Sequence, residues 1–182
     1  MTDFSDSELL EKFRNPDTCH YAFNLLVKKY QQRIYWHVRR MVIDHDDAND
    51  VVQNIFIKVW KNLSGFREHS RLYTWLYRIT TNESISFLNS KRTKFFLPLA
   101  DVEDQLATQL NSDPLFSGDA IQRKLQQAVL KLPQQQRIIF NMKYFDHLKY
   151  EEISEVLGVT VGALKASYHH AVKKIEKYLT QN

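Results

Sequence analysis

The sequence predicts an all-α protein of two small helical domains joined by a flexible acidic linker. Three observations support this fold class. Long stretches place apolar residues three and four positions apart, which is the period of an amphipathic helix. Only four Gly and four Pro interrupt these stretches in 182 residues. Residues 95–122 contain no Lys or Arg but hold several Asp, Ser and Pro residues, which is typical of a boundary between domains.

The composition limits the class of protein. A hydrophobic fraction of 43% with 13% aromatic residues is typical of a globular chain. Cys19 is the single cysteine, which excludes an intramolecular disulfide and fits a reducing compartment. The acidic start has no apolar segment, and no later run approaches 18 apolar residues. We therefore expect a cytoplasmic protein that does not insert into a membrane.

Charge is distributed unevenly along the chain. Residues 58–94 carry eight basic and two acidic side chains, and residues 123–182 carry ten and five. Residues 95–122 carry five acidic side chains and no basic one. Basic blocks can be simple solvated faces. Two of them on aromatic-bearing helices favour nucleic acid over a membrane as the partner.

The first half of the chain predicts three helices. Ser5 and Glu8 form a capping-box pattern, so a short helix is expected to end before Pro16. Residues 18–42 predict a long helix whose apolar surface is too broad for one neighbour, which places it inside a helical bundle. Residues 46–63 predict the third helix, with either Asp44 or Asp46 as its cap.

Ile57 lies opposite the centre of the apolar stripe of the 46–63 helix, among polar residues. A single exposed apolar residue is ordinary on a protein surface. Periodicity alone therefore leaves open whether Ile57 has a function.

A loop at residues 64–71 is expected to precede a helix that runs to about Lys91. Packing in the core is the expected role of Trp75 on that helix. Phe66 lies in the loop among basic residues, where either core packing or stacking on an unpaired base would explain it.

The C-terminal part predicts a helix-turn-helix. One helix is expected from Asp119 to Leu132, and Pro133 opens the next. A short helix at 150–157 ends at Gly158, and Thr160 caps the final helix. A short helix, a glycine turn and a second helix describe this motif.

Two groups of residues resemble a known family. The first is the pattern Asp47-x-x-Asp50-Val51-Val52-Gln53-x-x-Phe56-Ile57-x-x-Trp60, followed by Phe66-Arg67, residues 74–79 and Asn82. It resembles region two of the extracytoplasmic-function sigma factors of bacterial RNA polymerase. The second comprises Leu132-Pro133, residues 150–153, Leu157-Gly158 and residues 161–165. It resembles region four of the same group, and the two motifs occur in the family's order and separation.

The resemblance divides the chain into region two at 1–94, a linker at 95–118 and region four at 119–182. In the family the linker follows the RNA path of the polymerase, so its acidic residues could mimic nucleic acid. A solvated tether is the other interpretation.

The resemblance also implies three sets of site residues. The set expected to contact core RNA polymerase comprises Asp47, Asp50, Gln53, Asn54, Ile57 and Trp60. The set expected to recognise the minus-ten promoter element and its melted strand comprises Phe66, Arg71, Tyr73, Tyr77, Arg78 and Asn82. The set expected to contact the minus-thirty-five element comprises Lys165, Ser167, His169, His170, Lys173 and Lys174.

The expected partners are core RNA polymerase, promoter DNA as duplex and single strand, and an anti-sigma factor. No cofactor, metal or catalytic residue is implied. The chain departs from the family in its final helix, where Ser167, His170 and Val172 stand at positions in which Arg is frequent. The promoter sequence that it reads is therefore not implied by the resemblance.

Three other function classes were considered. A conventional helix-turn-helix regulator would bind duplex DNA without polymerase, usually as a dimer. A helical adaptor would need no basic recognition helix. An enzyme is not expected, because the sequence has no Gly-rich phosphate loop, His-x-x-x-His pair or Cys cluster, and the adjacent His169 and His170 diverge around a helix.

Overall fold

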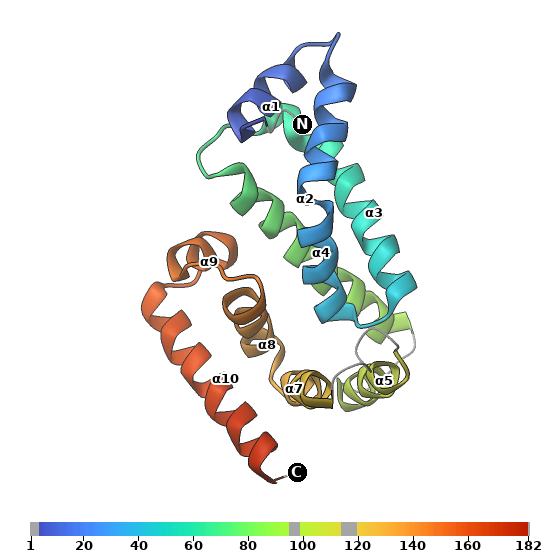
Figure 1. Cartoon of the computed structure of the whole chain (residues 1–182), viewed down its shortest axis with the longest axis vertical. Helices are drawn as coiled ribbons and strands as arrows, with labels where there is room; N and C mark the ends of the chain where they lie inside the picture. Colours follow the sequence, from blue (N-terminus) through green and yellow to red (C-terminus); the bar gives the residue numbers. More distant parts are fainter. Residues whose placement is uncertain (1–3, 95–98, 114–119, 182) are drawn as a thin grey trace.

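The computed structural model describes residues 4–94, 99–113 and 120–181, and within these ranges it contains helices and no strand (Figure 1). The all-α fold class is therefore confirmed. The elements in chain order are α1 (Asp6–Arg14), α2 (Cys19–Val42), α3 (His45–Asn62), η1 (Leu63–Gly65), α4 (Leu72–Lys94), α5 (Leu99–Ser112), α7 (Ala120–Leu130), α8 (Gln134–Phe140), the π-helical turn η2 (Asn141–Phe145), α9 (Tyr150–Leu157) and α10 (Val161–Gln181).

The N-terminal domain is a bundle in which α2 packs against α1, α3 and α4. Leu26, Tyr30, Ile34 and Val38 recur every four residues on α2, and each is at most 5% exposed. Other buried residues of this helix lie beyond that row, among them Ala22 and others at its C-terminal end. The predicted central position of the long helix is confirmed.

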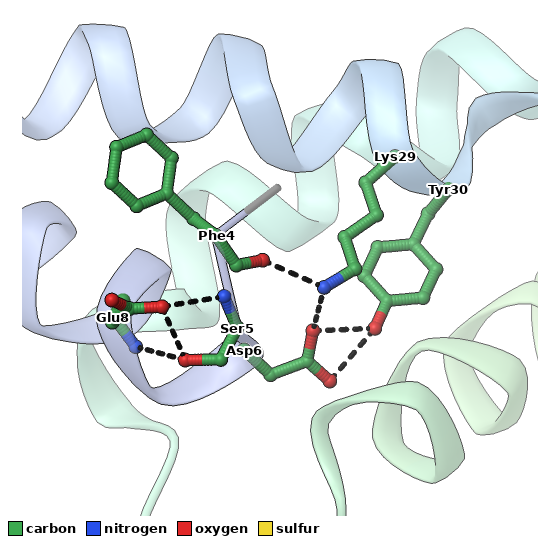
Figure 2. Close-up of polar contacts among 6 residues, drawn as sticks. All are labelled: Phe4, Ser5, Asp6, Glu8, Lys29 and Tyr30. Atoms are coloured by element: carbon green, nitrogen blue, oxygen red, sulfur yellow. Dashed lines mark hydrogen bonds and ion pairs between the residues drawn. The ribbon is translucent and has the colours of Figure 1, made fainter. Parts of the chain in front are cut away.

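The capping box at the start of α1 forms as predicted (Figure 2). The Ser5 backbone N–H donates to the Glu8 carboxylate at 2.7 Å, and the Glu8 N–H donates to the Ser5 hydroxyl at 3.3 Å. The hydrogen bonds from Ser5 lower the pKa of the Glu8 carboxyl. Two free amides at this helix end thereby find partners.

The start of α1 is tied to α2 by a small polar network (Figure 2). The Lys29 ammonium donates to the Phe4 carbonyl and also lies 2.9 Å from the Asp6 carboxylate. The Tyr30 hydroxyl donates to Asp6 at 2.7 Å. Burial, then the bond to Asp6, raises the pKa of Tyr30, so its phenol remains a donor.

Helix α3 begins at the expected cap. The Asp44 carboxylate accepts from the Asp47 N–H at 2.9 Å, which identifies Asp44 rather than Asp46 as the capping residue. Ala48, Val51, Ile55 and Val59 form the buried stripe of this helix. The opposite face is left to solvent.

The middle of the predicted linker differs from expectation, because it forms helix α5. Leu110 is fully buried and Leu106 is 6% exposed, and both pack with Ile43 and Leu130. The four-residue spacing of the two leucines forms an apolar stripe, which outweighs the acidic composition of the segment. Residues 95–98 and 114–119, also part of the predicted boundary, lie outside the described residues.

The C-terminal domain has the predicted helix-turn-helix. Helix α9 has the expected bounds, and Gly158 follows it in the left-handed conformation at φ +68°. The Thr160 hydroxyl accepts from the Ala163 N–H at 3.4 Å and so caps α10. Pro133 lies one residue before α8 instead of inside it.

The two domains touch in this structure. Figure 1 shows α9 beside α4, and the two helices are in contact. Leu76 and Tyr77 of α4 belong to the same buried cluster as Leu148, Ile153 and Val156 of the C-terminal domain. The apolar core is therefore continuous from one domain to the other.

Candidate functional site

The outward face of α3 presents the centre of the first predicted set. Asp50, Gln53, Asn54 and Ile57 are all exposed. Their spacing of three, four and seven residues places them in one row along the helix. Ile57 is 46% exposed, which confirms that it points away from the core. The row combines one apolar side chain with carboxylate and amide groups, a surface suited to binding another protein.

The two ends of this predicted set are tied to the domain itself. The half-buried Asp47 forms an ion pair with Lys91 of α4. The Trp60 ring packs on Phe13 and Phe23 at centroid distances of 5.4 and 5.0 Å, and His20 stacks on it at 4.9 Å. Both residues therefore have a structural role at the edge of the exposed row.

The second predicted set is divided by the structure. Arg71, Arg78 and Asn82 are exposed side chains on α4 or just before it. Tyr73 is half-buried, whereas Tyr77 is only 1% exposed. Tyr77 packs on Tyr73 and on His37, at centroid distances of 4.6 and 5.1 Å. In this conformation Tyr77 is a core residue and offers no surface to DNA.

Phe66 is also in the core. It is 7% exposed and packs on Trp75 at a centroid distance of 5.1 Å. Core packing, the first of the two interpretations left open by the sequence, describes Phe66 in this structure. Stacking on a base would require the 64–71 loop to move.

Burial raises the pKa of Tyr73 to about 12. Burial, followed by the nearby Asp146 carboxylate, also raises the pKa of Tyr77. Both phenols therefore stay neutral at physiological pH. The neutral hydroxyls keep the centre of the α4 face uncharged.

Helix α9 lies over the exposed part of this α4 face. Arg71 faces the Glu152 carboxylate at 3.5 Å, and the Arg78 guanidinium donates to the Glu155 backbone carbonyl. Asn82 lines a cavity of about 280 Å³ together with Gln134 and Val156. The three exposed residues of the second set thus all face the C-terminal domain.

An inter-domain cluster around Asp146 is absent from the sequence-based predictions. The Asp146 carboxylate lies 2.6 Å from Nδ1 of His37 and 3.0 Å from the Arg40 guanidinium. The Asp146 side chain is 4% exposed and that of His37 is fully buried. Burial lowers the pKa of Arg40, and Asp146 opposes this effect. The one hint in the sequence is polar His37, Arg39 and Arg40 on a helix expected to be buried.

The third predicted set lies along α10. Lys165, His169, His170 and Lys173 are exposed, and Ser167 is half-buried. Lys174 is exposed but donates to Gln136 at 3.0 Å.

Three small residues on the first turns of α10 are also exposed: Gly162, Ala163 and Ala166. Small side chains at the start of this helix let its backbone approach another molecule closely. The exposed basic and imidazole groups lie beside that approach, so the helix offers a surface suited to DNA.

Neither a metal site nor a membrane span is found where the chain is described. Across 4–94, 99–113 and 120–181, no group of three or more His, Cys, Asp or Glu side chains could hold a metal ion. In the same ranges no helix is both long and apolar enough to cross a membrane.

Comparison with known proteins identifies the family. Residues 26–94 match Sigma-70 region 2, and residues 122–175 match Sigma-70, region 4. The RNA polymerase sigma-H factor of Pseudomonas aeruginosa is 32% identical over 98% of this chain and 96% of its own. The ECF RNA polymerase sigma factor SigW of Bacillus subtilis is 32% identical over 87% and 89%. The chain belongs to the ECF group of sigma-70 factors.

Solved structures of sigma factors have the same fold. CnrH, in complex with the cytosolic domain of CnrY, has a TM-score of 0.70 at 21% identity and 96% coverage of both chains. RpoE of Bartonella quintana, in complex with the anti-sigma factor NepR, has a TM-score of 0.68 at 19% identity, covering 87% of this chain and 96% of that one. As an ECF sigma factor the chain is an RNA polymerase sigma factor, and the alternative of a conventional helix-turn-helix regulator is not favoured.

Proposed function

We propose that this sigma factor binds core RNA polymerase through the exposed row Asp50, Gln53, Asn54 and Ile57 on α3. The observation that carries the proposal is the exposure of Ile57 among polar side chains on a rigid helix. A half-exposed isoleucine gains by being covered, and the neighbouring carboxylate and amides orient the partner. Asp47 and Trp60 hold the two ends of the row in place.

Promoter recognition is divided between the two domains in this proposal. Arg71, Arg78 and Asn82 contact the minus-ten element and its melted strand, with Tyr73 beside them. Lys165, Ser167, His169 and His170 approach base edges of the minus-thirty-five element. Lys173 and Lys174 contact its phosphates. Exposed cationic side chains on both domains support this division, because phosphate contacts position a protein on DNA.

The protein catalyses no reaction itself in this proposal and acts in the cytosol, where the polymerase works. Its relatives are sigma factors and not enzymes. An anti-sigma factor is proposed as a further partner, because CnrH and RpoE were both solved with a bound inhibitor or partner chain.

The test is transcription by bare core polymerase from a library of promoter fragments, with and without the full chain. We expect defined transcripts that depend on the chain and share an upstream and a downstream element. Transcripts that remain at the level of core polymerase alone, with a chain that binds duplex DNA unaided, would overturn the proposal.

A further inference from the structure

The surface of α4 proposed to bind the minus-ten element is occupied by acidic or acceptor groups of the C-terminal domain. Glu152 places a carboxylate at Arg71, and Glu155 places its backbone carbonyl at Arg78. DNA would bring phosphate oxygens to the same two guanidinium groups. Helix α9 and a DNA strand therefore compete for these side chains.

Apolar packing holds α9 in this position. Leu148, Ile153 and Val156 are each at most 6% exposed, and they belong to the buried cluster that contains Leu76 and Tyr77. Separation of the domains would expose these side chains to water, which opposes opening.

Asp146 adds a polar lock to this contact. Its turn is held by two backbone bonds, from the Asp146 N–H to Asn141 and from the Leu148 N–H to Met142, at 3.1 and 3.0 Å. The turn directs the carboxylate onto His37 and Arg40 of α2, where it is almost fully buried. Removal of one charge from a buried pair leaves the other without compensation, so this carboxylate should favour the closed arrangement strongly.

The closed arrangement is too short for a promoter. The minus-ten and minus-thirty-five elements are about 25 base pairs apart, which is roughly 85 Å of duplex at about 3.4 Å per base pair. Helix α10 contacts α9, and α9 contacts α4. The 21 residues of α10 span only roughly 32 Å at about 1.5 Å per residue. Both elements cannot be reached while α9 rests on α4.

We propose that the free chain is autoinhibited: α9 covers the minus-ten surface of α4, and Asp146 inserted between His37 and Arg40 is the latch. The inference rests on the proposed function of α4. The domains must separate before that surface meets DNA. The apparent affinity for DNA is then reduced by the small fraction of open chains.

The experiment uses the full chain and substitutions on both sides of the latch. Asp146→Asn removes the carboxylate charge, and Arg40→Gln removes its partner from the other domain. Glu151→Gln is the matched control, because it removes one negative charge from an exposed position of α9. Small-angle X-ray scattering reports domain separation, and fluorescence anisotropy reports binding of a labelled, randomised single-stranded DNA pool.

Asp146→Asn and Arg40→Gln should both raise the radius of gyration and tighten DNA binding about tenfold, whereas Glu151→Gln should match the wild type. Arg40→Gln is the stronger test, since loss of a positive charge would by itself weaken DNA binding. The two substitutions lie in different domains, so a local folding defect cannot imitate a shared gain.

An unchanged radius of gyration in both latch variants would overturn the proposal. Equal tightening by Glu151→Gln would overturn it too, because net charge would then explain the effect. Opening without tighter DNA binding would remove autoinhibition while leaving the sigma-factor function intact. Failure of the proposed function would show separately, as an absence of chain-dependent transcription.

Discussion

Two outward faces of the N-terminal domain differ in their accessibility. The row on α3 is open to solvent along Asp50, Gln53, Asn54 and Ile57. The corresponding row on α4 is covered, with Arg71 and Arg78 engaged by α9. The difference indicates an order of events, in which polymerase can bind to α3 of the closed chain but promoter DNA cannot reach α4 until the domains separate.

The largest expected effect concerns the packing that keeps α4 covered. Leu110 is fully buried between Ile43, which ends α2, and Leu130 of α7. Leu110→Ala should lower the free energy of unfolding by about 3 kcal/mol, because a buried leucine is replaced by a cavity. Chemical denaturation measures the change.

Leu179→Ala is the control for Leu110→Ala, since Leu179 is 40% exposed on α10. This substitution should change the free energy of unfolding by less than about 0.5 kcal/mol. Equal effects of the two substitutions would mean that α5 does not dock on the domains in solution.

The next effect concerns the open face. Ile57→Glu should weaken binding of core polymerase by about 2 kcal/mol or more, roughly 30-fold, because it places a charge at the centre of the proposed contact. The melting temperature should change little, since the side chain already faces solvent. Surface plasmon resonance with immobilised core enzyme measures the affinity.

Tyr21→Glu is the matched control for Ile57→Glu, because Tyr21 is 56% exposed on α2 and lies outside the α3 row. It should bind polymerase like the wild type. Wild-type affinity in the Ile57→Glu variant would show that the open face is not the polymerase contact.

The α10 face offers a third comparison, between two lysines. Lys165→Ala should cost about 1 to 2 kcal/mol at one base position and relax preference there, as loss of a base contact does. Lys173→Ala should weaken binding to all sequences and reduce the salt slope by about one. Selection from a promoter library with each variant holoenzyme distinguishes them. An altered sequence preference in the Lys173 variant would mean that α10 is rotated differently in the groove.

The smallest effect lies far from both faces, at the α1 cap. Ser5→Ala should lower the free energy of unfolding by about 1 kcal/mol at neutral pH. The lowered pKa of Glu8 contributes stability above the unfolded-state pKa, and this part is lost as the pH falls through the folded-state pKa. The difference between wild type and variant should therefore shrink below about pH 4.3, the ordinary pKa of Glu. A difference that stays constant with pH would separate Glu8 from the cap.

Local signals in the sequence predict much of this fold. The capping residues Ser5, Asp44 and Thr160 mark helix starts, and Gly158 marks a helix end, because each acts within a few residues of its own backbone. The outward direction of Ile57 follows from helical periodicity alone.

Other features depend on contacts between distant residues. His37 and Asp146 are 109 residues apart in the chain, and no local pattern pairs them. The burial of Phe66 and Tyr77 likewise depends on neighbours that the sequence does not place. Helix α5 could have been predicted from its leucine spacing, but the acidic composition of the segment favoured a tether.

The most direct test of the difference between the α3 and α4 faces is a distance between the domains. In a Cys19→Ser background, spin labels at Gln32→Cys on α2 and Lys177→Cys on α10 both occupy exposed positions. Double electron–electron resonance should give one short distance for the free chain. It should give a distance longer by tens of ångströms in the complex with polymerase and promoter, given the roughly 85 Å between the two elements. The same distance in both states, in a complex that transcribes, would contradict the account.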